Sequence, residues 1–282
     1  MLLCYDGRAV RTYESLSELT SAVAFRICDD KRLTREVLER AGLPVPAGRL
    51  ATWDGDDVAF LAEQGELVVK PARGEGGEGV TVGVTTPEEL QAARQAAQRY
   101  CTDVLLEQFC PGEDLRVVVI GGQVVAASVR RPATVVGDGH STVGDLIEAR
   151  SRMRQEETDG ASRIPLDETT RQVVEKAGYR LQDVLDDGVE LRVRRTANLH
   201  TGGTIHDVTG RLHPALAGGA LAVARAIDIP VVGVDLAIEA LDRPEFVVIE
   251  ANEQPGLANH EPQPTAQRYI DVLFPETADG LR

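Results

Sequence analysis

The sequence predicts an α+β fold, and three observations lead to this expectation. Short apolar runs typical of buried strands occur at 67–71, 231–238 and 246–251. Stretches with helical periodicity and capping residues lie between such runs. Strands and helices do not follow the strict alternation that builds a doubly wound parallel sheet. With 282 residues the chain can bury a sizeable core, and its length permits one large domain or two lobes.

Capping residues indicate where the helices begin. Asp29 or Asp30 can cap a helix whose apolar positions share one face, and Gly42 ends it. Thr86 followed by Pro87 has the N-cap and first-turn proline that begin another helix. Residues 145–159 are highly charged and are expected to form a solvated helix and loop. The expected helices are, in order, 31–41, 87–99, 145–159, 167–177, 214–227 and 265–274.

Strands are expected wherever β-branched and apolar residues cluster between turn residues. Residues 1–25 look like a short leader with one strand at 2–5, too short to form a domain. Glycine-bearing loops are expected at 74–79 and 198–204. The expected strands are 2–5, 67–71, 80–84, 104–109, 115–120, 124–130, 191–195, 231–238 and 246–251.

Composition restricts the class of protein. The formal net charge of −15 argues against a nucleic-acid surface, although a pocket with a few cations can still hold a phosphorylated small molecule. No run of eighteen apolar residues and no targeting segment is evident, so we expect a cytoplasmic protein without a membrane partner. The four cysteines form no C-x-x-C pair, so neither a zinc knuckle nor a disulfide framework is indicated.

Lysine is rare in this chain, where only Lys31, Lys70 and Lys176 occur among 30 basic residues. A retained lysine can mark a site that needs a compact ammonium group and not the planar guanidinium of arginine. Compositional drift is the alternative explanation.

The glycine-rich segment Gly74 to Gly79 is a candidate phosphate-binding loop. Glycines allow backbone N–H groups to approach phosphate oxygens, and Lys70 and Arg73 at the mouth of the loop would add positive charge. The segment is not a Walker A motif, and a plain glycine-rich hairpin turn is the alternative.

Two apolar strands carry isolated acids. On alternate positions of one strand, Phe246, Val248, Glu250 and Asn252 are expected to share a face, and Asp235 interrupts the other strand. If the two strands are neighbours, two carboxylates and an amide oxygen converge, and these are ligands that Mg²⁺ prefers. The alternative is that each acid caps a loop or pairs with an arginine.

A third candidate is Glu107 with Asp114, which lie seven residues apart across a Pro-Gly bend. An extended segment can contact adenine through its backbone while an acid beyond the turn accepts hydrogen bonds from ribose hydroxyls. An ordinary strand and turn is the alternative.

The five histidines show no metal-binding spacing, and none is assigned to catalysis.

In their order along the chain, the candidate residues resemble the nucleotide- and metal-binding residues of the ATP-grasp superfamily of carboxylate–amine ligases. Within it, segments 135–142 and 198–209 look like the ligase domain of cyanophycin synthetases, and segment 252–266 looks like N-acetylglutaminylglutamine synthetases. The resemblance implies two α+β lobes that hold ATP between them, with Mg²⁺ or Mn²⁺. It implies nucleotide contacts by Lys31, Lys70, Gly74, Gly76, Gly77, Gly79, Glu107, Gln108, Phe109 and Asp114, metal coordination by Asp235, Glu250 and Asn252, and an acyl-phosphate site near Arg194, Gly203 and Thr204.

The resemblance also implies a domain division and a reaction. We expect a leader at 1–25, an N-lobe at 26–105, a C-lobe at 106–275 and a tail at 276–282. The expected reaction is ADP-forming ligation through an acyl phosphate, with N-acetylglutamine and glutamine as the favoured small-molecule substrates. A cyanophycin-synthetase-like or peptide-modifying ligase, or a non-catalytic nucleotide-binding module, is the alternative.

Two departures from the family concern possible partners. Relatives usually carry a further N-terminal domain that helps build the acceptor site, and cyanophycin synthetases continue into a Mur-ligase-like domain. A partner protein that supplies the N-terminal function, or a homo-oligomer, is therefore compatible with the sequence.

Overall fold

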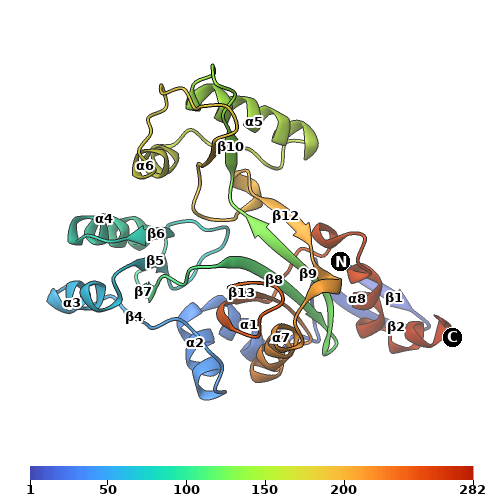
Figure 1. The fold of residues 1–282 in the computed structure, drawn as a ribbon. Helices are drawn as coiled ribbons and strands as arrows, with labels where there is room; N and C mark the ends of the chain where they lie inside the picture. The colour runs from blue at the N-terminus through green and yellow to red at the C-terminus, as the bar shows by residue number, and fades with distance from the viewer. Residues whose placement is uncertain (282) are drawn as a thin grey trace. The chain divides into compact units, whose positions relative to one another are not determined.

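The structure is a computed structural model that describes residues 1–281, with the side chains of residues 1–278. The tail predicted at 276–282 therefore lies partly outside the described residues. The chain forms two compact units. The main unit comprises Met1–Val129 and Asp207–Arg282, and the inserted unit comprises Arg130–His206. Helices and antiparallel sheets make up the fold, so the predicted α+β class is confirmed (Figure 1).

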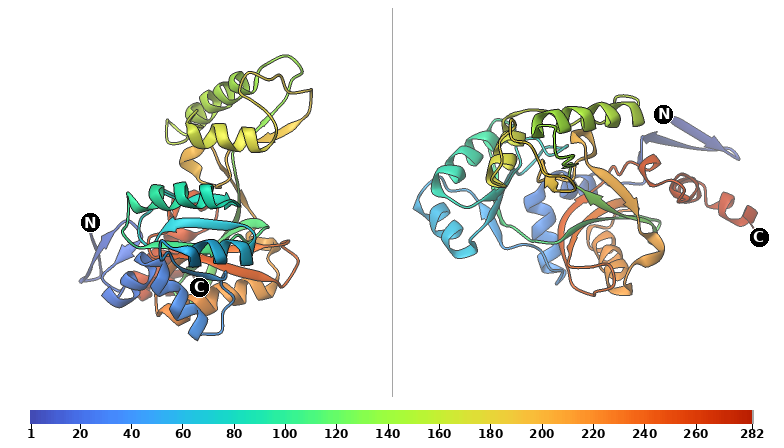
Figure 2. Two further views of the ribbon diagram at one scale, coloured as in Figure 1. Left: turned by 90° about the vertical axis from the view of Figure 1, so that its left-hand side faces the viewer. Right: turned by 45° about the horizontal axis from the view of Figure 1, so that its top comes forward.

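A five-stranded sheet, with order β12-β9-β8-β13-β14, supplies the largest core of the main unit. Valine-rich β8 and β13 pair antiparallel, and β13 pairs antiparallel with β14. Leu38 and Leu216 pack with Leu236 in one buried cluster, so α2 and α7 cover one face of these strands (Figures 1 and 2). The strands are β8 Glu113–Ile120, β9 Gln123–Arg131, β12 Thr204–Asp207, β13 Val231–Ile238 and β14 Phe246–Asn252; the helices of this layer are α1 Ala22–Asp29, α2 Lys31–Arg40 and α7 Pro214–Ile227.

Strand β14 contains a bulge that changes the predicted orientation of its side chains. The register pairs Val248 with Leu236 and Glu250 with Asp235, so Ile249 is the extra residue. Val248 and Ala251, three positions apart, are both buried in the core cluster. The expectation that Phe246 and Val248 share a face with Glu250 and Asn252 is therefore wrong. The bulge places Val248 and Ala251 in the core and turns Glu250 to the opposite face.

The glycine-rich segment connects two strands of a separate four-stranded antiparallel sheet, with order β4-β7-β5-β6. Leu67 and Val69 of β5 and Leu106 of β7 are fully buried and pack with Leu90 of α4. The predicted N-cap Thr86 accepts a hydrogen bond from the Glu89 amide, so this helix start is confirmed. The elements are β4 Gly48–Leu50, α3 Gly55–Gln64, β5 Leu67–Pro71, β6 Thr81–Val84, α4 Pro87–Gln98 and β7 Val104–Gln108.

The predicted leader forms a three-stranded sheet of β1 Leu2–Tyr5, β2 Arg8–Tyr13 and β3 Leu16–Ser17. Val10 is buried with Tyr269 and Leu273 of α8 (Thr265–Leu273), and the Tyr269 hydroxyl donates a hydrogen bond of 3.0 Å to the Leu16 carbonyl. Figures 1 and 2 show β1 and β2 beside α8. Residues 1–17 therefore pack on the main unit, which the sequence left open.

The inserted unit has its own small core. Ile147 of α5 packs with Val135 of β10, Val174 of α6 and Leu191 of β11. The prediction of a solvated helix at 145–159 holds for most of its surface, although Ile147 is fully buried. The elements are β10 Thr134–Val136, α5 Val143–Glu157, α6 Glu168–Lys176 and β11 Glu190–Arg192. The 3-10 turns of the chain are η1 Leu199–Thr201, η2 Thr209–Arg211, η3 Ala258–His260 and η4 Pro275–Leu281.

Candidate functional site

Three charged side chains form a row across adjacent strands of the main unit. Arg116 of β8 lies opposite Asp235 of β13, and Asp235 lies opposite Glu250 of β14. Residues directly opposite on antiparallel strands present their side chains on the same face of the sheet. Asn252 joins this face two residues beyond Glu250, opposite Gly233. The structure thus brings together the three predicted metal ligands and adds an arginine.

Arg116 holds Asp235 through two nitrogens of its guanidinium group. Its Nε donates to Asp235 Oδ1, and its Nη2 donates to Asp235 Oδ2 over 3.0 Å. The two side chains are only 15% and 7% exposed, so the pair is largely removed from water. Asn252 Nδ2 donates a longer bond of 3.4 Å to Asp235 Oδ2. The alternative anticipated for Asp235, a pair with an arginine, is therefore present in this structure.

Lys31 connects the second acid to the glycine-rich loop. Its Nζ lies 3.1 Å from Glu250 Oε1 and donates a hydrogen bond of 2.8 Å to the Gly74 carbonyl. Asp30 caps α2 by accepting from the Arg32 amide, which places Lys31 at the first position of this helix. A single ammonium group therefore lies between the loop and β14.

Lys70 and Glu107 form a buried ion pair on neighbouring strands of the four-stranded sheet. Their charged atoms are 2.6 Å apart, and the side chains are 7% and 6% exposed. Burial alone would lower the pKa of Lys70, but the negative charges of Glu107 and Glu250 outweigh this effect and raise the pKa above its usual value. Lys70 is therefore charged at neutral pH.

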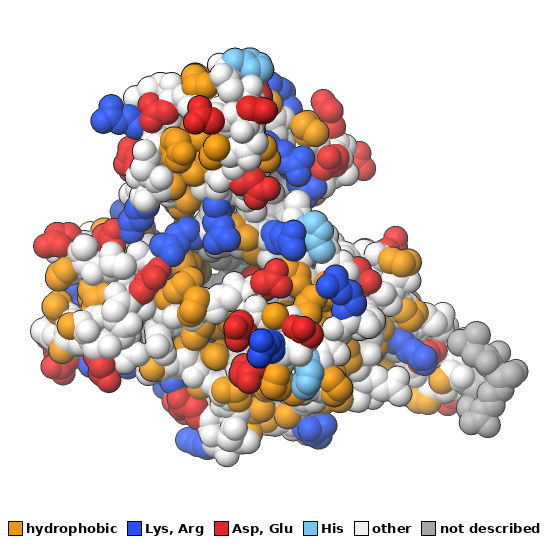
Figure 3. All heavy atoms as spheres, viewed as in Figure 1, with side chains coloured by type: hydrophobic (Ala, Val, Ile, Leu, Met, Phe, Trp, Pro, Cys, Tyr) orange, Lys and Arg blue, Asp and Glu red, His pale blue; other side chains and the backbone are white. Residues whose placement is uncertain are grey.

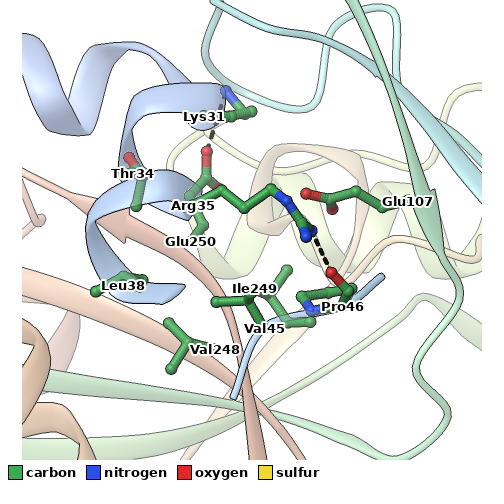
Figure 4. A pocket seen from close by; sticks show the side chains of 10 residues that line it. All are labelled: Lys31, Thr34, Arg35, Leu38, Val45, Pro46, Glu107, Val248, Ile249 and Glu250. Atoms are coloured by element: carbon green, nitrogen blue, oxygen red, sulfur yellow. Dashed lines mark hydrogen bonds and ion pairs between the residues drawn. The ribbon is translucent and has the colours of Figure 1, made fainter. Parts of the chain in front are cut away.

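A small pocket lies beside these residues in the main unit (Figure 4). Arg35 of α2 extends across it and donates to the Pro46 carbonyl, while Glu107 and Glu250 contribute carboxylates. A methyl group on Gly48 would lie 2.7 Å from the Arg35 guanidinium, so a side chain there would collide with it. The pocket is lined by Lys31, Thr34, Arg35, Leu38, Val45, Pro46, Glu107, Val248, Ile249 and Glu250.

The loop after β5 needs its glycines for backbone reasons. Gly74, Gly76, Gly77 and Gly79 all have positive φ, between 66° and 129°, which other residues rarely adopt. Arg73 does not supply a free cation at the mouth of the loop as expected. Its guanidinium donates to the buried Asp30 carboxylate at 3.3 Å. Lys31 contacts the start of the loop instead.

The segment after Glu107, where an adenine contact is predicted, has two backbone amides that are hydrogen-bonded within the protein. Gln108 N–H donates to the Ala47 carbonyl, and Phe109 N–H donates to the Glu66 carbonyl, so neither amide is available to a nucleotide in this structure. Asp114 lies near the start of β8, opposite Ala237 of β13. Contact of these residues with adenine and ribose stays a prediction.

The predicted acyl-phosphate residues belong to the inserted unit. Arg194 is 8% exposed, and its Nη1 donates to Asp167 Oδ1 at 2.6 Å and to Thr170 Oγ1 at 3.1 Å. The Gly203 carbonyl accepts from Arg154, and Thr204 Oγ1 lies 2.9 Å from His206 Nε2. Their role stays a prediction.

The donor set on β13 and β14 fits a hard divalent cation that is shared with another ligand. Among the described residues no group of three or more His, Cys, Asp or Glu could hold a metal alone. Asp235, Glu250 and Asn252 offer two carboxylates and an amide, too few oxygens for six-coordinate Mg²⁺ without water or phosphate. Burial, together with the charges of Glu75, Asp29 and Glu250, raises the pKa of nearby Glu253.

Comparison with known proteins identifies the family. A family model described as an ATP-grasp domain matches residues 28–178, more than half of the chain. The chain belongs to the ATP-grasp family. The predicted resemblance to this family, and to cyanophycin synthetases within it, is confirmed.

Two curated relatives illustrate the similarity. A cyanophycin synthetase from Nostoc sp. is 33% identical over 99% of this ATP-grasp chain and 32% of its own length. A glutathione biosynthesis bifunctional protein GshAB from Clostridium perfringens is 26% identical over 95% of this chain and 37% of its own. The chain thus spans about a third of the curated relatives it matches.

Solved structures confirm the ATP-grasp fold. A bifunctional glutathione synthetase from Pasteurella multocida superposes with a TM-score of 0.65 and 27% identity, over 98% of this chain and 40% of that one. A D-alanine–D-alanine ligase from Bacillus anthracis superposes with a TM-score of 0.57 and 16% identity, over 93% and 72%. The second similarity concerns the fold alone.

The surface of this ATP-grasp chain mixes both signs of charge. In Figure 3 acidic and basic side chains lie next to one another on the main unit. Local ion pairs of the main unit include Arg26 with Asp29 at 2.6 Å and Arg35 with Glu39. Within the described part of the chain, no helix has the length and hydrophobicity needed to cross a membrane.

Proposed function

We propose that this chain is an ATP-dependent, ADP-forming ligase that joins a carboxylate to an amine through an acyl phosphate. The single observation that carries the proposal is the convergence of Asp235, Glu250 and Asn252 on one face of two paired strands, with Lys31 between them and the glycine-rich loop. Carboxylate and amide oxygens beside a cation and a flexible glycine backbone suit a metal-bound polyphosphate. Family membership supports the same conclusion.

Each side chain then has a defined task. Lys31 and Lys70 would balance phosphate charge, and the loop amides would surround the terminal phosphate. Asp235, Glu250 and Asn252 would hold Mg²⁺, which supplies charge neutralisation of the transferring phosphoryl group when it is bound. Positioning and electrostatics suffice for phosphoryl transfer to a carboxylate, so the reaction needs no nucleophilic side chain from the protein.

The favoured substrates are an N-acylated amino acid such as N-acetylglutamine and, as the acceptor, glutamine. This choice rests on the resemblance of segment 252–266 to N-acetylglutaminylglutamine synthetases. A cyanophycin-synthetase-like activity on amino-acid or peptide carboxylates is the second candidate. It is supported by the 33% identity to a cyanophycin synthetase over nearly the whole chain.

Hydroxylamine trapping tests the reaction class and the acid together. Incubation with ATP, Mg²⁺ and hydroxylamine should convert an activated carboxylate into a hydroxamate, with release of ADP and phosphate. N-acetylglutamine, free amino acids and aspartate-rich peptides form the panel. Hydroxamate from N-acetylglutamine supports the first candidate, and hydroxamate only from the peptides favours the second.

A nucleotide-binding module without turnover gives a different result in the same experiment. Nucleotide would raise the melting temperature, but no acid in the panel would release phosphate. The Glu250→Gln variant is the matched control because it removes one proposed ligand charge and keeps the side-chain shape. Equal hydroxamate formation by this variant and the unmodified chain would contradict the metal assignment.

A further inference from the structure

The N-terminal sheet, formed by β1, β2 and β3, has no task in the proposed reaction, yet it is bonded to a segment of the candidate site. Gln254 Nε2 donates a hydrogen bond of 2.8 Å to Glu14 Oε2 in the turn between β2 and β3. Gln254 lies two residues beyond Asn252, the candidate metal ligand at the end of β14. Glu14 precedes residues 28–178, which the family model matches, so that match does not explain this contact.

The backbone at Glu14 is unfavourable for a glutamate. Glu14 and Ser15 form the two-residue loop between β2 and β3, and Glu14 has a φ of 51°. Glycine, asparagine or aspartate normally occupies such a position. The other two-residue loop of this sheet follows the rule, because Asp6 and Gly7 supply its positive φ values. A glutamate at position 14 is therefore explained better by its side chain than by the turn.

The turn gains little from side-chain hydrogen bonds of its own. Ser15 is 3% exposed, and within the described part of the chain its hydroxyl has no hydrogen-bond partner. The Glu14 carboxylate instead accepts from Gln254, which is 240 positions away in the sequence. A hydrogen bond to an ionised carboxylate is stronger than one between neutral groups. The side chain of Glu14 is thus committed to the segment after β14.

Other contacts fix the N-terminal sheet on the main unit. Val10 is buried in one cluster with Tyr269 of α8, and the Tyr269 hydroxyl donates a hydrogen bond of 3.0 Å to the Leu16 carbonyl. Leu16 follows the turn directly after Ser15, so this bond holds the turn in place. Glu14 can therefore restrain Gln254 from a supported position.

The segment after β14 contacts β13 on both sides of Gln254. Asn252 lies opposite Gly233, and Asn252 Nδ2 is 3.4 Å from the Gly233 carbonyl. A methyl group on Gly233 would lie 3.0 Å from Pro255 Cβ. Between these two contacts the Gln254 side chain is held by Glu14. The position of Asn252 therefore depends on the path of the residues that follow it.

We propose that Glu14 is a positioning residue, whose hydrogen bond with Gln254 fixes the segment after β14 so that Asn252 keeps its place in the site during turnover. The N-terminal sheet then takes part in the activity without a group that contacts substrate. This inference rests on the proposed function, because it takes Asn252 to be a site residue.

Reversal of the hydrogen bond tests the proposal. Gln254→Glu places a second carboxylate against Glu14, and the repulsion should lower kcat for hydroxamate formation at saturating substrate by at least about fivefold. The double variant Glu14→Gln/Gln254→Glu restores an amide-to-carboxylate bond in the opposite direction at unchanged net charge. Its kcat should return to within about twofold of the unmodified chain. A purely structural role would lower the melting temperature and leave kcat of the folded protein unchanged.

Two results of this comparison contradict the inference. Unchanged kcat in Gln254→Glu would overturn it. A loss of kcat that the double variant does not restore would also overturn it, because the new charge at position 254, and not the lost bond with Glu14, would then cause the loss.

A second variant keeps the test valid if Gln254→Glu fails to fold. Glu14→Ala removes the acceptor, adds no charge and leaves a side chain at the same positive φ, so it should lower kcat by at least about threefold. Glu18→Ala is its matched control, because Glu18 is an exposed carboxylate beside the same sheet that pairs with Arg11 at 3.4 Å. Equal kcat in Glu14→Ala and Glu18→Ala would overturn the inference.

The proposed function has its own readout in this experiment. If the unmodified chain forms no hydroxamate with any acid of the panel, the proposed function fails and the inference fails with it. Hydroxamate formation by the unmodified chain that the variants at positions 14 and 254 leave unaltered would overturn the inference alone.

Discussion

Breaking the buried Lys70–Glu107 pair should destabilise the fold far more than breaking an exposed pair. At 2.6 Å and an effective dielectric constant of 20, the attraction is about 6 kcal/mol, part of which offsets the desolvation of the two groups. Glu107→Gln leaves the Lys70 ammonium buried without its main partner, although Glu250 still lies near enough to raise its pKa. We therefore expect a loss of about 3 kcal/mol, the lower end for a broken buried pair.

Urea denaturation of the nucleotide-free protein at pH 7 measures this loss. The exposed pair Arg11–Glu18, with a separation of 3.4 Å and side chains 83% and 41% exposed, supplies the control. Glu18→Gln should change the free energy of unfolding by less than about 1 kcal/mol. Equal losses for Glu107→Gln and Glu18→Gln would refute the reasoning.

The pH dependence gives an independent check on the same pair. Because the folded-state pKa of Lys70 is raised above 10.5, its contribution is fully present below that pH and disappears as the pH rises through the folded value. The contribution of charged Lys70 to the stability of the unmodified chain should therefore persist from pH 7 to about pH 10. A contribution that vanishes by pH 9 would contradict this assignment.

Three further predictions concern separate features. Glu250→Gln should abolish turnover in the hydroxamate assay and leave the far-ultraviolet circular dichroism spectrum unchanged; ordinary activity would contradict the metal assignment. Gly112→Ala should cost several kcal/mol of stability, because its methyl group would lie 2.3 Å from a backbone oxygen of β13, whereas Gly122→Ala, which meets nothing within 4 Å, should cost about 1 kcal/mol from its positive φ alone. In the native protein a thiol reagent should label exposed Cys4 quickly and buried Cys28 slowly, because burial and nearby acids raise the pKa of Cys28 to about 12; mass spectrometry showing equal rates would contradict this.

Local signals in the sequence were sufficient for most elements. The Thr86 and Asp30 caps depend on residues within one helical turn, and the structure confirms both helix starts. The β13 and β14 runs were recognisable because buried strands need continuous apolar residues. The whole ordered set of candidate residues was enough to predict the family, since their order along the chain does not depend on the exact register of the sheets. This set comprises Lys31, Lys70, the glycine-rich loop, Glu107 with Asp114, Asp235 and Glu250 with Asn252.

The candidate site was predicted less completely, and the misses have a common cause. Arg73 was expected to face a ligand, but it pairs with Asp30, and Arg116 was not singled out although it interrupts an apolar strand at an alternating position. Partners such as Arg116 and Asp235, 119 residues apart, meet only when the strands are paired. A sequence pattern cannot supply that pairing, because cross-strand neighbours are set by register.

The sequence by itself determined the fold class, the family and the residue types gathered around Glu250. Tertiary structure decided what those residues face. The bulge at Ile249 sends Val248 into the core and Glu250 to the face of Asp235, and Arg116 and Lys31 balance the two acids. The physical reason is that side-chain direction in a strand alternates with a period of two, so one extra residue reverses every assignment beyond it.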